Sequence, residues 1–188
     1  MSRTAIVRFF YHYYGISKLV YTFTTMYRDI TAIGKAGFIG FRTIAELWED
    51  SSVIPKAKGV YMILHNAGNP KYLAKGVGGF HKQRDPNLPI EQLASYWINN
   101  CRVLYIGKAG GEDSSQTLYK RLRQYLDFGR GKPVGHYGGR LIWQLQHHPE
   151  LLVAWKLTPR SDPREKEKKL IHEFEAYYGK LPFANLMR

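Results

Sequence analysis

Three short apolar runs constrain the fold of this chain more than any other feature of its sequence. They read GVYMIL at 59–64, VLYIG at 103–107 and LLVAWKL at 151–157. Each has the length and the β-branched or aromatic content of a strand, and turn-forming residues lie close to each. The runs therefore predict a small sheet. Two of them carry a tyrosine close to a glycine, Tyr61 and Tyr105, which a purely structural strand does not require.

Helical patterns occur around these predicted strands. Short helices are expected at 41–50, around 90–98, at 117–126 and at 140–145. A final helix has clearer ends. Asp162 is a candidate N-cap, Pro163 occupies the first helical position, and Gly179 is placed to end the helix.

One glutamate of this final helix lies on its apolar side. At about 100° per residue, Glu167 projects within about 20° of the centre of that face. The face is formed by Leu170, Ile171, Phe174, Tyr177 and Tyr178. A carboxylate there is costly unless a metal ion or an arginine pairs with it. The alternative is that Glu167, near the start of the helix, simply reaches solvent.

The composition indicates a polyanionic partner. The formal net charge is +13, with 28 Lys and Arg residues, and nucleic acid is the commonest partner of such a protein. A basic surface that only maintains solubility is the alternative. Cys101 is the single cysteine, so the chain can form neither an intramolecular disulfide nor a cysteine-rich zinc site, which fits a cytoplasmic location. No segment reads as membrane-spanning, so no membrane partner is expected.

Five motifs in a fixed order resemble those of the GIY-YIG nuclease superfamily. They are GVY at 59–61, YIGK at 105–108, KRLRQY at 120–125, EKKLI at 167–171 and PFAN at 182–185. The resemblance implies an α/β (α+β) fold with a small, mostly antiparallel sheet of about three strands flanked by helices. The resemblance covers roughly 58–188, and we expect a nuclease domain at 39–188 that carries an insertion at 71–100. Residues 1–38 form an N-terminal extension whose role is open: an ordered arm, a DNA-contacting extension or an upstream addition.

The resemblance also implies an activity and a set of site residues. The activity is metal-dependent hydrolysis of DNA phosphodiester bonds, with Mg²⁺ or Mn²⁺ as the cofactor. Glu167 would bind the metal, Arg121 would bind the phosphate, and Tyr61 would act as general base or position the water, with its pKa lowered by nearby cations. Three further residues would orient the water or polarise the phosphate: Tyr105, Lys108 and Tyr125. Asn185 would position Tyr61 or the glutamate. We also expect glycines beside the tyrosines to leave room for the phosphate.

Two departures from the superfamily pattern leave choices open. The interval from Glu167 to Asn185 is longer than usual, so Glu173 is an alternative metal ligand. The insertion leaves the rim that faces the substrate undefined. Further candidates for DNA contact are Arg84, Arg123, Arg130, Lys132, His136 and Arg140.

The sequence leaves several functional alternatives open. One is a nucleic-acid-binding module that keeps the fold and lacks catalysis. Another is a ribonuclease or a nuclease specific for single strands. The biological role (restriction or defence, repair, or a mobile element), the strand preference, and the choice between monomer and homodimer are also open.

Overall fold

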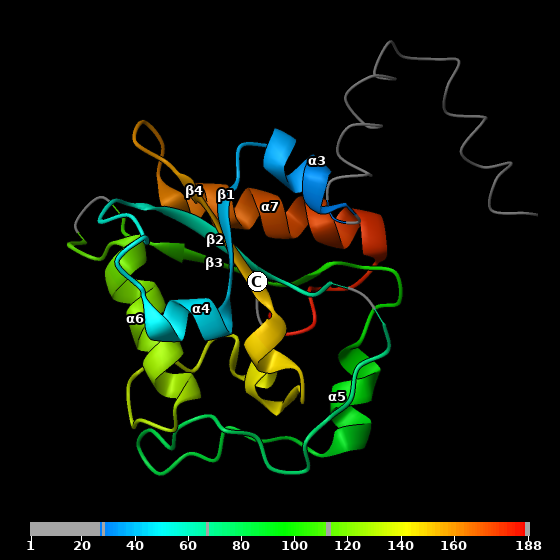
Figure 1. Cartoon of the computed structure of the whole chain (residues 1–188). Helices are drawn as coiled ribbons and strands as arrows, with labels where there is room; N and C mark the ends of the chain where they lie inside the picture. The colour runs from blue at the N-terminus through cyan, green and yellow to red at the C-terminus, as the bar shows by residue number, and fades with distance from the viewer. Residues whose placement is uncertain (1–26, 28, 67, 112–113, 187–188) are drawn as a thin grey trace, which may run out of the picture.

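The computed structural model describes residues 27, 29–66, 68–111 and 114–186 (Figure 1). Its centre is a four-stranded sheet in the order β1-β4-β2-β3, and all neighbouring strands are antiparallel. The strands are β1 (Ile39–Thr43), β2 (Gly59–Leu64), β3 (Val103–Ala109) and β4 (Leu152–Leu157). The predicted α/β fold with a small antiparallel sheet is confirmed. The sheet has four strands rather than about three.

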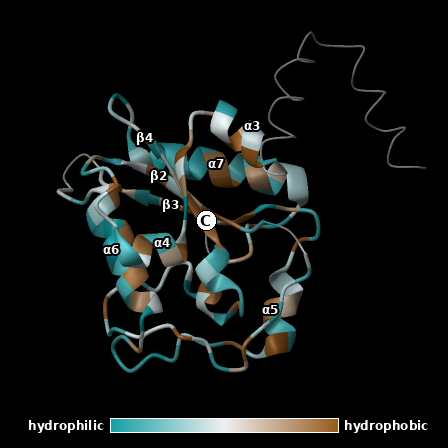
Figure 2. Cartoon of the chain, in the orientation of Figure 1, coloured by the Kyte–Doolittle hydropathy of each residue, from teal (hydrophilic) through white to brown (hydrophobic). Residues whose placement is uncertain are grey.

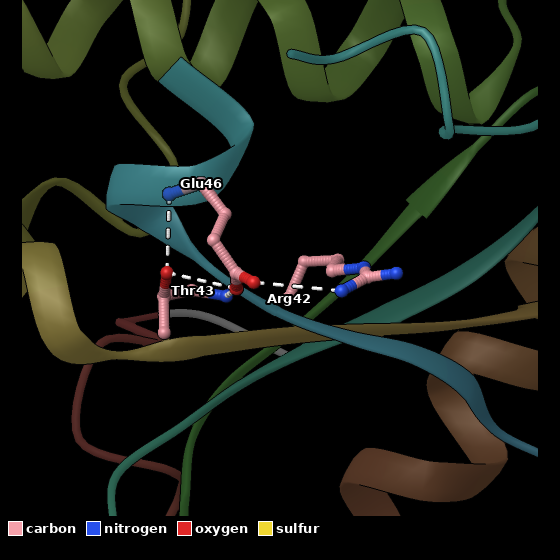
Figure 3. A network of polar contacts seen from close by, with 3 residues as sticks. All are labelled: Arg42, Thr43 and Glu46. Carbon is pink, nitrogen blue, oxygen red and sulfur yellow. Dashed lines mark hydrogen bonds and ion pairs between the residues drawn. The ribbon is translucent and has the colours of Figure 1, made fainter. Parts of the chain in front are cut away.

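The additional strand is β1, in a region where the sequence predicted one helix at 41–50. The chain instead forms β1 and then α4 (Ile44–Glu49). Thr43 caps α4 reciprocally with Glu46: the Thr43 Oγ1 accepts from the Glu46 N–H at 3.1 Å, and the Glu46 carboxylate accepts from the Thr43 N–H at 2.7 Å (Figure 3). This Thr-x-x-Glu pattern is legible in the sequence and marks where the helix begins.

The strand itself is irregular, which explains why the sequence pattern missed it. A bulge falls between Gly40 and Arg42, and φ is 95° at Gly40 and 49° at Phe41. The bulge breaks the alternation of side chains on which strand prediction depends. A Cβ on Gly40 would lie 2.6 Å from the Trp155 ring of β4, so glycine also lets the neighbouring indole pack there.

Two helical layers cover the two faces of the sheet. In the view of Figure 1, α4 and α6 (Leu118–Gly129) lie below it, while α3 (Ile30–Lys35) and α7 (Pro163–Tyr178) lie above. Side chains of β2 alternate between the layers: Tyr61 and Ile63 belong to the core with α6, and Met62 to the core with α7. Figure 2 shows that α6 and α7 both carry hydrophobic and hydrophilic residues, as expected for helices with one buried side.

The final helix begins and ends where the sequence predicted. Asp162 accepts from the Arg164 N–H at 3.0 Å, Pro163 begins the helix, and Gly179 ends it with φ at 69°. In the part of the chain that the structure describes, no helix is both long and apolar enough to span a membrane.

Part of the predicted N-terminal extension packs on the α7 layer. Tyr27, Ile33 and Phe38 are buried there, and the Tyr27 hydroxyl donates to the Leu170 carbonyl at 3.0 Å. Residues 1–26 and 28 of this extension, whose role the sequence left open, lie outside the described residues.

The insertion at 71–100 runs beneath the α6 layer and contains α5 (Ile90–Tyr96). The Gln144 side chain in the 3₁₀ helix η2 (Arg140–Gln144) connects the insertion to the rest of the domain. Its amide nitrogen donates to the carbonyls of Leu73 and Leu88, at 3.3 and 2.9 Å, and its oxygen accepts from the Leu88 N–H at 2.8 Å. A second 3₁₀ helix, η3 (His148–Glu150), leads into β4.

Candidate active site

The two predicted tyrosines meet on one face of the sheet. Tyr61 lies opposite Gly107, and Ile63 lies opposite Tyr105, in the β2–β3 pair. The centroids of the two tyrosine rings are 5.9 Å apart. The register of the two strands therefore brings the two phenols together.

The glycine in β3 accommodates a tyrosine ring. A Cβ on Gly107 would lie 2.6 Å from Cζ and 2.7 Å from the hydroxyl of Tyr61, and 2.9 Å from Cε1 of Tyr105. The Tyr61 ring fills the space that we expected a phosphate to use, so that expectation is wrong for Gly107. Tyr61 and Gly107 occur together because the Tyr61 ring of β2 crosses β3 at the position where β3 carries no side chain.

Tyr125 of α6 extends the aromatic cluster inward. Its ring stacks on Tyr105 at 6.3 Å between centroids, and its hydroxyl donates to the Gly139 carbonyl at 3.3 Å. The side chain is fully buried. Tyr125 therefore holds the 138–139 turn against Tyr105, and the expectation that it contacts water or phosphate is wrong in this structure.

A cavity of about 510 Å³ opens beside this cluster at the free edge of β3. Its walls come from β3, from the segment at 137–140, from α7 and from the chain that follows α7, which meet at this edge because no further strand covers it. The lining residues are Tyr105, Lys108, Tyr137, Gly138, Gly139, Arg140, Arg164, Glu167, Lys168, Ile171, Ala184, Asn185 and Leu186. Four of the predicted site residues, Tyr105, Lys108, Glu167 and Asn185, thus line one cavity.

Glu167 is a half-buried carboxylate in this cavity, with cations around it. Burial raises its pKa, while Lys108, Arg121 and Arg164 act in the opposite direction. Among the described residues Glu167 makes no ion pair. Arg164 was not predicted, although its position three residues before Glu167 places it on the same helix face.

The alternative ligand Glu173 lies elsewhere on α7. Its carboxylate is 3.9 Å from the Lys169 ammonium, and it contributes to the raised pKa of Tyr27 in the core next to α3. It does not line the cavity. The geometry therefore favours Glu167 over Glu173.

Tyr61 and Arg121 lie behind the cavity wall rather than in it. The Tyr61 side chain is fully buried, and no described group makes a hydrogen bond to its hydroxyl with good geometry. Burial raises the pKa of Tyr61, Arg121 opposes this rise, and Glu167 adds to it. The lowered pKa expected for a general base is thus contradicted by burial, and Arg121 is close enough to both Tyr61 and Glu167 to affect them electrostatically.

Asn185 fixes the C-terminal segment to the edge of β3. Its Oδ1 accepts from the Ile106 N–H and its Nδ2 donates to the Ile106 carbonyl, both at 2.9 Å. The neighbouring Ala184 N–H donates to the Leu104 carbonyl at 2.8 Å. The Asn185 amide therefore forms the two hydrogen bonds to Ile106 that a further strand would form. Since Ile106 lies between Tyr105 and Gly107, Asn185 has a positioning role.

The predicted DNA-contacting residues fall into different environments. Arg140 lines the cavity and Arg84 is exposed on the insertion. Arg130 donates to the Trp48 carbonyl at 2.7 Å, and Lys132 pairs with Asp127 at 2.8 Å.

The other two of these residues also make contacts within the protein. Arg123 donates to the Ser51 hydroxyl at 3.2 Å. His136 is fully buried against the Tyr125 ring, at 4.8 Å between centroids, so the expectation that it contacts DNA is wrong in this structure. Burial, together with the nearby Arg121, lowers the pKa of His136 well below its usual value and keeps the imidazole neutral.

No family model, curated protein or solved structure matches this chain. The assignment of the site therefore depends on its geometry and on the order of its motifs.

Proposed function

We propose that this protein is a metal-dependent endonuclease that hydrolyses DNA phosphodiester bonds. The observation that carries the proposal is the setting of Glu167: a half-buried carboxylate that lines a cavity with Tyr105 and Lys108. Arg121 and Arg164 bring further positive charge to the same carboxylate. The Glu167 carboxylate can hold a metal cation, and the basic side chains around it can hold a phosphate. Phosphodiester hydrolysis needs both of these functions in one place.

The residues present fit a single hydrated divalent cation. Among the described residues there is no cluster of three or more His, Cys, Asp or Glu side chains that could hold a metal. Mg²⁺ keeps several of its waters and binds through one or two carboxylates together with substrate phosphate, so Glu167 alone suffices on the protein side. When bound, the ion would neutralise phosphate charge and acidify a coordinated water. Mn²⁺ accepts the same oxygen ligands.

The protein residues would divide the remaining work between them. Lys108 and Arg164 line the cavity and would bind the non-bridging oxygens of the phosphate. Arg121 would supply positive charge from behind the wall and limit the rise in the pKa of Glu167 that burial causes. The Tyr105 hydroxyl, whose pKa burial raises well above its usual value, would remain protonated and orient water or phosphate as a donor.

One observation favours the alternative of a binding module without catalysis. Tyr61, the expected general base, is fully buried with a raised pKa. A module that only binds DNA would not need the Glu167 carboxylate, however, because an anion in a phosphate-binding cavity opposes binding. The retained carboxylate is the reason to prefer the nuclease.

The test is cleavage of plasmid DNA and of single-stranded DNA with Mg²⁺, Mn²⁺ or EDTA. Glu167→Ala should abolish metal-dependent cleavage, and Glu173→Ala, a matched change on the same helix, should leave it intact. Loss of activity only in Glu173→Ala would keep the enzyme and move the metal ligand. DNA binding without cleavage by the wild type under any divalent ion would support the binding module and refute the nuclease.

A further inference from the structure

A second cavity adjoins the candidate active site. Its volume is about 390 Å³, and it shares Arg140, Asn185 and Leu186 with the first cavity. Its other walls come from the insertion, through Leu88 and Tyr96, and from the segment that follows α7. The insertion thus contributes a wall next to the site although it contributes none of the predicted catalytic residues.

The shared residue Arg140 stands between the two cavities. Its guanidinium carbon lies 4.1 Å from the centroid of the Tyr137 ring, and Tyr96 lies near enough to act on its charge. Its Nε is buried and makes no hydrogen bond to a described group, and no described carboxylate pairs with it. An arginine that lines both cavities and pairs with no described carboxylate suits a phosphate, because the planar fork of its terminal nitrogens can contact two oxygens at once.

The second cavity suits a nucleobase. Tyr96, Leu88 and Leu186 are half-buried and offer apolar surface on which a planar ring can lie. The volume is within the range of small-molecule pockets. Lys180, which also lines the cavity, adds positive charge at its rim. A base, with a phosphate on one side of it, matches an apolar pocket that is bordered by an arginine.

We infer that the second cavity binds an unstacked nucleobase of the substrate strand, with the adjoining phosphate held by Arg140. This inference rests on the proposed nuclease function, since the neighbouring nucleotide then presents its phosphate to Glu167. A base can enter only after it leaves its stack, which costs least in single-stranded or locally unpaired DNA. The protein should therefore prefer single-stranded or distorted DNA to a regular duplex.

The test measures binding in EDTA, where no cleavage occurs. Two labelled oligonucleotides are compared by fluorescence anisotropy: a short oligothymidylate, and an abasic analogue with the same number of phosphates. Tyr96→Ala should weaken binding of the oligothymidylate by about 5- to 100-fold, the usual loss for one base–aromatic stack. Binding of the abasic analogue should not change, since its phosphates are retained.

Three controls make the comparison specific. Tyr96→Phe keeps the ring and should bind the oligothymidylate within about twofold of the wild type. Tyr177→Ala removes a half-buried tyrosine that lines neither cavity and should leave both affinities unchanged. Arg140→Ala should weaken the binding of both oligonucleotides. It should also reduce the slope of log affinity against log salt concentration by the amount expected for about one phosphate contact. Because both ligands are measured on the same sample, a loss of folded protein cancels in their ratio.

The outcomes separate the inference from the function on which it rests. If Tyr96→Ala weakens both oligonucleotides equally, or neither, while plasmid cleavage that depends on Glu167 persists, the base-binding cavity is refuted and the nuclease stands. If the wild type neither binds nor cleaves any DNA, both proposals are refuted. A selective loss for the oligothymidylate supports the inference.

Discussion

Replacing Gly107 by alanine tests the claim that the tyrosine cluster determines which residue β3 can carry at this position. The added Cβ would lie 2.6 Å from Cζ and 2.7 Å from the hydroxyl of Tyr61, and 2.9 Å from Cε1 of Tyr105. Carbon atoms in favourable contact are about 3.5–4.0 Å apart. Tyr61 is fully buried and Tyr105 is 7% exposed, so neither ring can swing into solvent to relieve the contact.

The size of the effect follows from two opposing contributions. Overpacking a core costs about 1–3 kcal/mol, the cost of rings forced off their rotamers included, and three contacts below 3.0 Å to two buried rings favour the upper part of that range. Gly-to-Ala in a strand recovers about 0.5–1 kcal/mol of backbone entropy, and the φ of Gly107 is not positive, so alanine meets no backbone strain. The net expectation is a loss of about 1–2.5 kcal/mol in the free energy of unfolding. For a chain of this length that corresponds to a fall in Tm of about 2–10 °C.

The assay is thermal unfolding followed by circular dichroism, with Gly111→Ala as the matched control. Among the described, non-adjacent residues, the nearest heavy atom to a Cβ at Gly111 is 3.9 Å away, so the Tm of Gly111→Ala should not change. The double variant Gly107→Ala with Tyr61→Ala should be more stable than the sum of the single changes predicts, because removing the ring makes room for the methyl group. A Tm for Gly107→Ala equal to or above that of the wild type would refute the argument, because the gain in backbone entropy alone would raise the Tm.

Three further predictions concern single side chains of the site. Asn185→Ala should lower the free energy of unfolding by about 2–4 kcal/mol, measured by urea denaturation, because it leaves both backbone groups of Ile106 without their partners. Tyr61→Phe should change the Tm little, because the buried hydroxyl makes no hydrogen bond of good geometry to a described group and has Tyr105 and Arg121 near it; a clearly lowered Tm would show that one of them is a full partner. Burial raises the pKa of Glu167 in the folded state above its value in the unfolded state. The ionised carboxylate therefore lowers the free energy of unfolding, and this loss develops as the pH rises from the unfolded-state pKa to the folded-state pKa. Glu167→Gln should thus be more stable than the wild type near pH 7 and lose that advantage below about pH 4, and a variant that is less stable near pH 7 would contradict the sign.

Features with local signals were predictable from the sequence. Strand β2 has the bounds that its apolar run indicated, and α7 begins after Asp162 and ends at Gly179 as its caps indicated. The alternation of side chains along β2 and β3 was enough to bring Tyr61 and Tyr105 together once the strands paired. In each case the deciding interactions lie within a few residues, or along one ladder of hydrogen bonds.

Features set by long-range packing were not predictable. The burial of Tyr125 depends on the turn at Gly139, which a hydrogen bond brings against it. His136 in the same loop reads as one member of a basic, exposed segment, yet it packs on the Tyr125 ring. Nothing periodic in the sequence reports such contacts. The bulge at Gly40, which makes β1 hard to recognise in the sequence, is a similar case. It is defined only by how β1 pairs with β4.

The position of the candidate site at the edge of the sheet explains how side chains from both layers can act on one carboxylate. Arg121 belongs to α6 on one face and Glu167 to α7 on the other, yet Arg121 opposes the rise in the pKa of Glu167 that burial causes. A further strand beyond β3 would separate them. An open edge is a liability, because its free backbone groups can pair with another chain. Asn185 resolves the conflict at Ile106, since its amide occupies both backbone groups there without adding a full strand. The edge next to Lys108 can thus stay open to the cavity, while Asn185 and Ala184 occupy the edge at Ile106 and Leu104.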